Sequence, residues 1–192
     1  MPDAGNATMG LLDVNDSLLL VVDMQSRLLA AMKPLLAKTA LENSVKLLTA
    51  ADLLKVPVLV TEQYPKGLGD TTEAINAALP SFTQRFEKTA FSCCGNEAFN
   101  QALLASACKQ IIIIGQEAHV CVLQTAIELM AQGFQVYVVE DAVLSRHEQH
   151  KANALQRLQA LGIAVTNHES VLFEWLRDAK HAQFKVISAL VR

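Results

Sequence analysis

The amino-acid sequence predicts an α/β fold: a three-layer α/β/α sandwich built on a six-stranded, mainly parallel sheet. Two features of the 192-residue chain lead to this prediction. Apolar runs of strand length alternate with helix-like patterns of about ten residues or more, which is typical of successive βαβ units. The runs are also almost continuously apolar, as in "SLLLVVDM" and "QIIIIG". Because such strands are buried on both faces, we expect helices on both sides of the sheet.

The expected elements follow one another in a regular order. Strands are expected at residues 17–24, 57–62, 84–89, 110–115, 134–142 and 163–167. Helices are expected at residues 41–55, 96–109, 120–132, 147–162, 169–179 and 181–192. Gly133 and Gly162 stand at the position where a chain commonly leaves a helix, which supports two of these boundaries.

The chain is expected to form one domain, because its length suffices for one well-buried core and is short for two. No linker, repeat or low-complexity segment divides it. The N-terminal segment "MPDAGNATMGLLDVND" is polar and lacks the basic and apolar regions of a signal peptide. We therefore expect a flexible tail over residues 1–16 and a single domain over residues 17–192.

The composition favours some kinds of binding partner over others. Hydrophobic residues make up 52% of the chain, yet no run reaches the roughly 18 apolar residues of a membrane helix. The surplus of apolar residues favours a homo-oligomer, a dimer or a tetramer, over a membrane partner. The net charge of −3 and the scattered lysines and arginines argue against nucleic acid, which attracts clustered basic residues. A small-molecule substrate is the expected partner.

The chain has four cysteines, at Cys93, Cys94, Cys108 and Cys121. Their spacing matches neither a metal framework nor a CxxC redox pair. The adjacent Cys93 and Cys94 are poorly placed to bond to each other. Reduced thiols in the cytoplasm are therefore expected.

Reactive side chains follow three of the expected strands. Asp23 ends the first strand, Lys88 ends the third, and Cys121 follows the fourth across the link "GQEAHV". In an open parallel sheet, ligands bind outside the carboxyl ends of the strands. A thiol at a helix N-terminus has its thiolate favoured, a nearby carboxylate can take the thiol proton, and an ammonium can hold both anions in place. Backbone N–H groups at the strand-to-helix turn would face a developing oxyanion.

These residues lie in segments that resemble the isochorismatase-like cysteine hydrolases. The segments are "LLLVVDMQSRLL", "RFEKTAFSCC" and "IIIIGQEAHVCVLQTAIELMAQGFQVYVVEDAVLSR", in that order, and the resemblance runs from about Ser17 to the C-terminus. The segments "VTEQYPKGLG" and "FKVISALV" are similar to those of the isochorismatase-domain-containing sub-group. The resemblance implies the isochorismatase-like hydrolase fold and a hydrolase acting on non-peptide C–N bonds.

The resemblance also implies roles for individual residues. Cys121 matches the nucleophile, Asp23 the general base and Lys88 the third member of the triad. A cis peptide bond is implied between Gln116 and Glu117. It would turn the Glu117 N–H inward to form the oxyanion hole with the N–H of Cys121, while Lys88 would keep Asp23 ionised and lower the thiol pKa.

Three further side chains are expected to contact the substrate. Gln25 matches a recurrent pocket-side glutamine of the family, and His119 lies two residues before the nucleophile. Tyr64 stands in a long loop after the second strand, where substrate contacts often lie. The sequence leaves the roles of four residues open: Cys93, Cys94, Ser145 and Arg146.

The sequence departs from the metal-dependent nicotinamidases of the superfamily. Those enzymes carry Asp-x-His after the second strand, whereas this chain has "TEQYPKGLG" there, with no histidine in residues 61–69. We therefore expect no metal and no other cofactor, and nicotinamide is disfavoured as the substrate.

Three functional hypotheses remain at this point. The first is hydrolysis of a small amide or related acyl compound through a thioester on Cys121. The second is isochorismatase-type hydrolysis of an enol ether, which releases pyruvate and needs a general acid but no thiol. The third is a binding protein with an idle site, because a fold alone does not establish a function.

Overall fold

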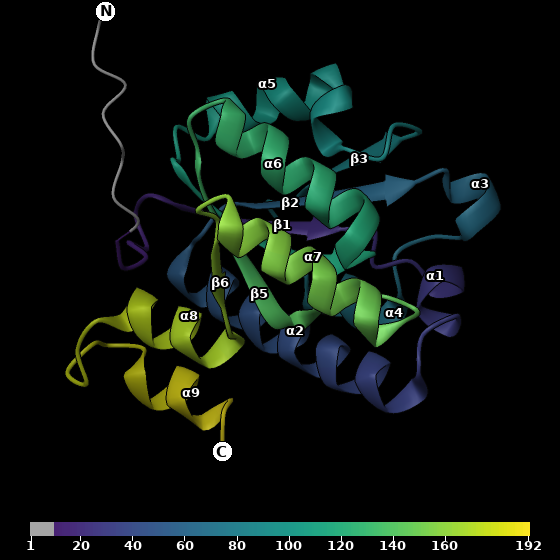
Figure 1. Ribbon diagram of the computed structural model, residues 1–192. Helices are drawn as coiled ribbons and strands as arrows, with labels where there is room; N and C mark the ends of the chain where they lie inside the picture. The colour runs from purple at the N-terminus through teal and green to yellow at the C-terminus, as the bar shows by residue number, and fades with distance from the viewer. Residues whose placement is uncertain (1–9) are drawn as a thin grey trace, which may run out of the picture.

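A computed structural model describes residues 10–192, which contain one six-stranded parallel sheet in the order β3-β2-β1-β4-β5-β6 (Figure 1). The strands are β1 (Ser17–Val22), β2 (Val58–Gln63), β3 (Gln84–Lys88), β4 (Gln110–Gln116), β5 (Gln135–Leu144) and β6 (Ala164–Thr166). All five neighbouring pairs of strands run parallel. The predicted α/β fold with six strands is confirmed.

Helices cover both faces of the sheet. The longer ones are α2 (Pro34–Leu54), α5 (Glu97–Ala105), α6 (Leu123–Ala131), α7 (Glu148–Ala160) and α8 (His168–Leu176). Shorter ones are α1 (Ser26–Ala30), α3 (Pro65–Leu68), α4 (Glu73–Ala78) and α9 (Phe184–Ala189), together with a 3₁₀ turn (Cys93–Gly95) and a π-helical turn (Ala118–Val122). Figure 1 shows α5, α6 and α7 on one face of the sheet, with α2, α8 and α9 on the other.

The alternation of side chains along β1 and β4 explains why these runs are apolar without interruption. Leu19, Val21 and Ile112 belong to the apolar cluster under α2, α8 and α9. Leu20 and Ile113, one residue along each strand, belong to the cluster under α5, α6 and α7. Successive side chains of a strand point to opposite faces, and here both faces are covered, so every position needs an apolar residue.

The predicted helices differ from the observed ones most at the beginning of the first long helix and at the end of the second, which ends at Ala105 instead of residue 109. The first long helix begins at Pro34, well before the expected residue 41, because proline is tolerated in the first turn of a helix, where its missing N–H is not needed. The short helices α1, α3 and α4 were not predicted, since four to six residues show too little periodicity to be recognised.

The expected tail over residues 1–16 needs correction for the part that is described; residues 1–9 of that prediction lie outside the described residues. Leu12 is fully buried in the cluster under α2 and α8. Its N–H donates to Glu174 Oε2 (2.7 Å), and its carbonyl oxygen accepts from Arg177 (2.8 Å). Asp16 accepts a hydrogen bond from the backbone of Lys109 at the start of β4. This segment is therefore packed against the domain.

The strand order reverses between β1 and β4, which places a crevice outside their carboxyl ends. Gly115 near the end of β4 permits the two strands to stay close there. Its φ is +120°, and a Cβ at this position would lie 1.9 Å from the carbonyl oxygen of Val22. No other residue type fits this approach without moving one strand.

Candidate active site

Asp23 follows β1 at the point where the strand order reverses. Its φ of +50° lies in the left-handed region, which aspartate tolerates better than most residues, and this turns the chain out of the strand. The Asp23 N–H donates to the carbonyl oxygen of Thr61 on β2 (3.1 Å), and its own carbonyl oxygen accepts from the N–H of Gln25 (2.7 Å). The carboxylate is thus fixed and fully buried at the carboxyl end of the sheet.

Lys88, the last residue of β3, forms a buried ion pair with this carboxylate. Lys88 Nζ lies 2.8 Å from Asp23 Oδ2, and both side chains are almost wholly buried. The ammonium also donates to Gln63 Oε1 (2.7 Å) and to the carbonyl oxygen of Phe91 (3.0 Å). Burial by itself lowers the pKa of Lys88, but nearby negative charge, Asp23 above all, outweighs it and raises the pKa above its usual value. Lys88 is therefore a firmly protonated, fully coordinated cation.

Cys121 is brought to the same place by the π-helical turn between β4 and α6. Its side chain is 5% exposed and lies in the electrostatic field of Asp23 and Lys88. Burial, and after it the charge of Asp23, raises the pKa of the Cys121 thiol well above its usual value, although Lys88 lowers it in part. Lys88 therefore acts on the thiol pKa in the predicted direction, but burial and the adjacent carboxylate together exceed its effect, so the net pKa is raised.

The peptide bond between Gln116 and Glu117 is cis, at the position that the resemblance implies. The carbonyl oxygen of Glu117 accepts from Val120 (3.0 Å) and Val122 (3.2 Å), which closes the turn that carries Cys121. The carboxylate of Glu117 leaves this turn and accepts from the N–H (3.0 Å) and the Nε (3.1 Å) of Arg146. These two hydrogen bonds connect the turn to the loop between β5 and α7.

His119 also connects this turn to the loop between β5 and α7. Its Nδ1 lies 3.0 Å from the Oγ of Ser145, and its ring is 4.8 Å from that of His150. Burial lowers the pKa of His119, with a partly opposing effect of Glu117. A neutral ring at neutral pH suits the contact with the serine hydroxyl. Ser145 and Arg146, to which the sequence assigned no role, are therefore the partners of the turn that carries Cys121.

Gln25 is fully buried, and its amide is occupied within the protein. Its Nε2 donates to the carbonyl oxygens of Gln63 (3.0 Å) and Gly69 (2.6 Å), and its Oε1 accepts from the N–H of Gln63 (2.7 Å). These bonds tie the end of β1 to the end of β2. Gln25 thereby positions the strand ends beneath the site, and its expected contact with the substrate stays a prediction.

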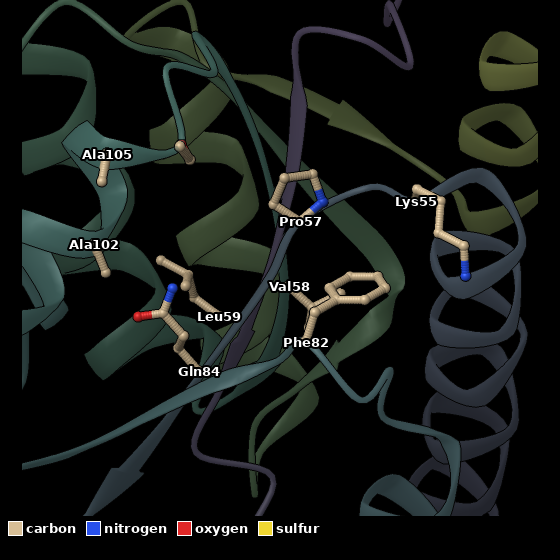
Figure 2. Close-up of a pocket in the computed structure, with 9 residues that line it drawn as sticks. Lys55, Pro57, Val58, Leu59, Phe82, Gln84, Ala102 and Ala105 are labelled. Carbon is tan, nitrogen blue, oxygen red and sulfur yellow. The ribbon is translucent and has the colours of Figure 1, made fainter.

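Tyr64 lies at the rim of a cavity of about 400 Å³ beside Lys88. Its side chain is 55% exposed, and Lys66 and Asn96 line other parts of the cavity. A second cavity of about 390 Å³ lies at the opposite, amino-terminal ends of β2 and β3. Figure 2 shows its apolar lining, which includes Pro57, Val58, Leu59, Phe82, Ala102 and Ala105. Being at the other edge of the sheet from Asp23, it does not belong to this site.

Sequence reasoning missed three polar residues that hold Asp23 and Lys88. Thr61 Oγ1 donates to Asp23 Oδ1 (2.8 Å), and Gln63 accepts from Lys88. The Nε2 of Gln116 donates to the carbonyl oxygen of Asp23 (3.1 Å). All three stand at the carboxyl ends of β2 and β4, so the signal that identified Asp23 and Lys88 also marks them.

Cys93 and Cys94 lie in the same region, and neither belongs to a group of described side chains that could hold a metal ion. Cys93 is fully buried, with its Sγ 3.6 Å from Thr61 Oγ1, and its burial raises the pKa of the thiol to about 11. Cys94 is half-buried in the 3₁₀ turn that opens at Ser92. Over residues 10–192, no three His, Cys, Asp or Glu side chains are placed to hold a metal ion.

Comparison with known proteins shows the family to which the chain belongs. A sequence model of the isochorismatase domain matches residues 17–170. The chain belongs to the isochorismatase family. Isochorismatase family protein 1A of Dictyostelium discoideum is 36% identical over 186 residues, which cover 95% of this chain and 89% of that protein. The fold and family predictions are confirmed, and with them the prediction of a hydrolase.

Solved structures of the family superpose closely on this chain. The structure of MAR1 ribonuclease from Caenorhabditis elegans has a TM-score of 0.89 and 34% identity, and the match covers 95% of this chain and 92% of that one. YcaC from Pseudomonas aeruginosa, solved with hexane-2,5-diol and covalent acrylamide, has a TM-score of 0.86 and 28% identity over 93% and 90% of the chains. YcaC from Escherichia coli, described as an octameric hydrolase of unknown specificity, has a TM-score of 0.85 and 27% identity over 93% and 88%.

Proposed function

We propose that this isochorismatase-family hydrolase cleaves the C–N bond of a small amide or related acyl compound through a thioester on Cys121. The observation that carries the proposal is the convergence of three side chains from three strand ends. A buried thiol with a raised pKa lies in the field of Asp23, whose carboxylate is paired with Lys88. A protonated thiol beside an anchored carboxylate is a nucleophile with its base in place.

In the first half of the proposed reaction, Asp23 accepts the proton of the Cys121 thiol as the sulfur attacks the carbonyl carbon. The charge that develops on the carbonyl oxygen is held by the backbone N–H groups of Glu117 and Cys121, in the turn that the cis peptide bond opens. As the C–N bond breaks, Asp23 returns the proton to the departing amine, and the acyl group remains on the sulfur.

In the second half, a water molecule attacks the thioester. Asp23 accepts a proton from that water, the carboxylic acid is released, and the proton returns to the thiolate of Cys121. Lys88 keeps a positive charge beside the carboxylate throughout, so Asp23 does not become an isolated buried anion. The cycle consumes one water and restores the starting protonation state.

His119 and Tyr64 are the side chains that we assign to the substrate pocket. His119 lies on the turn of the nucleophile, and Tyr64 stands at the rim of the cavity beside Lys88. Neither is assigned an acid–base role, because burial leaves the pKa of His119 lowered and the proton path already runs through Asp23.

Intact-mass spectrometry after incubation with a panel of small amides tests this function. We expect an acyl adduct on Cys121, located by peptide mapping, and turnover that falls by several orders of magnitude in Cys121→Ala. Cys108→Ala, which removes a thiol remote from the triad, serves as the matched control and should retain turnover. Near-normal turnover in Cys121→Ala would exclude the thioester mechanism.

Two other activities are included as arms of the same experiment. Isochorismate tests the enol-ether reaction that the family name suggests, and release of pyruvate that survives alkylation of Cys121 would support it. RNA tests the activity named for the Caenorhabditis elegans structure, although the net charge of −3 does not favour a polyanionic substrate. Alkylation of Cys121 no faster than a free thiol between pH 5 and 9 would support an idle site.

We further propose that the chain works as a homo-oligomer in the cytoplasm. The octameric YcaC structure supports self-association, and the four reduced cysteines fit a reducing compartment. In residues 10–192 no helix is long and apolar enough to cross a membrane. Light scattering coupled to size exclusion should give a mass of at least two chains, and a monomer at micromolar concentration would contradict the proposal.

A further inference from the structure

Thr61 holds the general base from two directions. Its carbonyl oxygen accepts from the Asp23 N–H (3.1 Å), and its hydroxyl donates to Asp23 Oδ1 (2.8 Å). Lys88 occupies the other carboxylate oxygen, Oδ2. Each oxygen of the buried carboxylate therefore accepts from a donor among the described residues, a hydroxyl on one side and an ammonium on the other.

The direction of the Thr61 hydroxyl is set by a neighbour. The Sγ of Cys93 donates to Thr61 Oγ1 at 3.6 Å, and the backbone N–H of Cys93 is held by Thr125 Oγ1 (3.0 Å). Since the pKa of Cys93 is raised to about 11, its thiol keeps its proton at neutral pH and remains a donor. Thr61 thus accepts from Cys93 and directs its own proton to Asp23, and all of these groups are fully buried.

We propose that Thr61 is a positioning residue for the proposed reaction, whose hydroxyl, oriented by Cys93, keeps Asp23 ionised and aimed to receive the thiol proton of Cys121. A hydrogen bond to the charged form of a carboxyl group stabilises that form. Lys88 supplies charge, but it binds only Oδ2. The Thr61 hydroxyl supplies the matching bond on Oδ1 and fixes the rotation of the carboxylate about its side-chain bond.

The inference rests on the proposed function, and acrylamide tests it without knowledge of the substrate. In this addition the Cys121 sulfur bonds to the terminal carbon of the double bond, and the proton goes to the carbon beside the carbonyl group. Peptide mapping follows modification of Cys121 separately from the other three thiols. In the unmodified sequence, the rate should rise with pH along an acid limb, and the midpoint of this limb is the quantity compared between variants.

Thr61→Val removes the hydroxyl and keeps the shape of the side chain. We expect the midpoint of the acid limb to move to higher pH by about one unit, because a hydrogen bond to a charged group is of that size. Thr61→Ser keeps the hydroxyl and should restore the midpoint to within about 0.3 unit. Thr61→Ala removes the same donor with less steric demand, so it reports the shift if the valine variant does not fold.

Thr49→Val is the matched control, since it deletes a threonine hydroxyl that donates to the carbonyl oxygen of Val45 within α2 and contacts neither Asp23 nor Cys93. Its midpoint should stay within about 0.3 unit of the unmodified protein. Equal midpoints in Thr61→Val and the unmodified protein would overturn the inference, as would an equal shift in Thr49→Val. Failure of the proposed function is distinguishable, because Cys121→Ala would then retain turnover or the acid limb would be missing from the start.

Discussion

At the scale of single residues, the site is a set of buried charges that compensate one another. Asp23 and Lys88 are both inaccessible, and each would be costly to bury alone. Lys88 has three close acceptors, which are Asp23, Gln63 and Phe91. The pair places an anchored carboxylate close to the Cys121 thiol, and it also makes the local fold depend on both charges.

Lys88→Met should therefore affect stability as well as activity. The substitution keeps the length of the side chain but leaves Asp23 buried without its counter-ion, which costs about 3–5 kcal/mol. Lys33→Met is the matched control, because the ion pair of Lys33 with Glu148 is exposed and contributes about 1 kcal/mol or less. Urea denaturation measures both. Equal losses in the two variants would contradict the account of the buried pair.

The buried thiols also predict how stability depends on pH. Burial raises the pKa of Cys93 to about 11 in the folded protein, whereas a thiol in an unfolded chain has a pKa of about 8.5. Below the unfolded value both states hold the proton, and the contribution to stability is constant. Above it only the unfolded state releases the proton, so stability falls as the pH rises towards 11.

We expect the free energy of unfolding to fall by roughly 1.4 kcal/mol per pH unit for each such thiol above pH 9. Cys93→Ala should lower stability at pH 7, because it leaves a small cavity, and should make the alkaline decrease shallower. Urea denaturation at pH 7, 9 and 10.5 provides the comparison. A variant whose decrease is as steep as that of the unmodified protein would contradict the raised pKa of Cys93.

At the scale of elements, the site depends on how closely β1 and β4 approach each other at their carboxyl ends. Gly115 pairs with Val22 in the register of the two strands, directly before Asp23 and Gln116. The absence of a side chain at Gly115 lets the backbone of β1 lie against β4, so that Asp23 and the turn that carries Cys121 lie side by side.

Two glycine variants separate this close approach from backbone conformation alone. Gly133 also has a positive φ (+93°), but a Cβ there would meet no atom within 4 Å, so Gly133→Ala should cost about 1–2 kcal/mol. Gly115→Ala adds a clash of 1.9 Å with Val22 and should cost more than about 4 kcal/mol or prevent folding. Yield and denaturation midpoints measure the difference. Similar effects of the two would show that packing at Gly115 is unimportant.

At the scale of the whole molecule, the segment before β1 packs against α8, near the other end of the sequence. Leu12 bonds to Glu174 and Arg177, in α8 and directly after it. Trp175 of the same helix donates to the hydroxyl of Ser17 at the start of β1 (3.0 Å). The start of the described chain and its C-terminal helices therefore form one layer against the sheet.

Leu12→Ala and Leu11→Ala test this layer with adjacent residues of the same type. Leu12 is fully buried, so its truncation should cost about 2–5 kcal/mol, whereas Leu11 is 61% exposed and should cost about 0.5 kcal/mol or less. Thermal unfolding at one fixed protein concentration measures both. An unfolding temperature unchanged by Leu12→Ala would show that the packing of this segment does not stabilise the domain.

The sequence by itself determined the layers, the six strands and the three strand ends that carry Asp23, Lys88 and Cys121. These follow from local patterns: continuous apolar runs report burial on both faces, and a polar residue directly after such a run marks an edge of the sheet. The sequence did not determine the limits of the longer helices, since a proline such as Pro34 occurs both in the first turn of a helix and shortly after the end of one.

Only the tertiary structure decided the state of the site. The net direction of the Cys121 pKa depends on burial and on the distance to Asp23, and neither is a property of sequence spacing. The same holds for Gln25, whose amide is used within the protein, and for Thr61, whose hydroxyl meets Asp23 across two strands. Local pattern thus selected the reactive groups. Contacts between residues far apart in the chain set their protonation, their partners and their orientation.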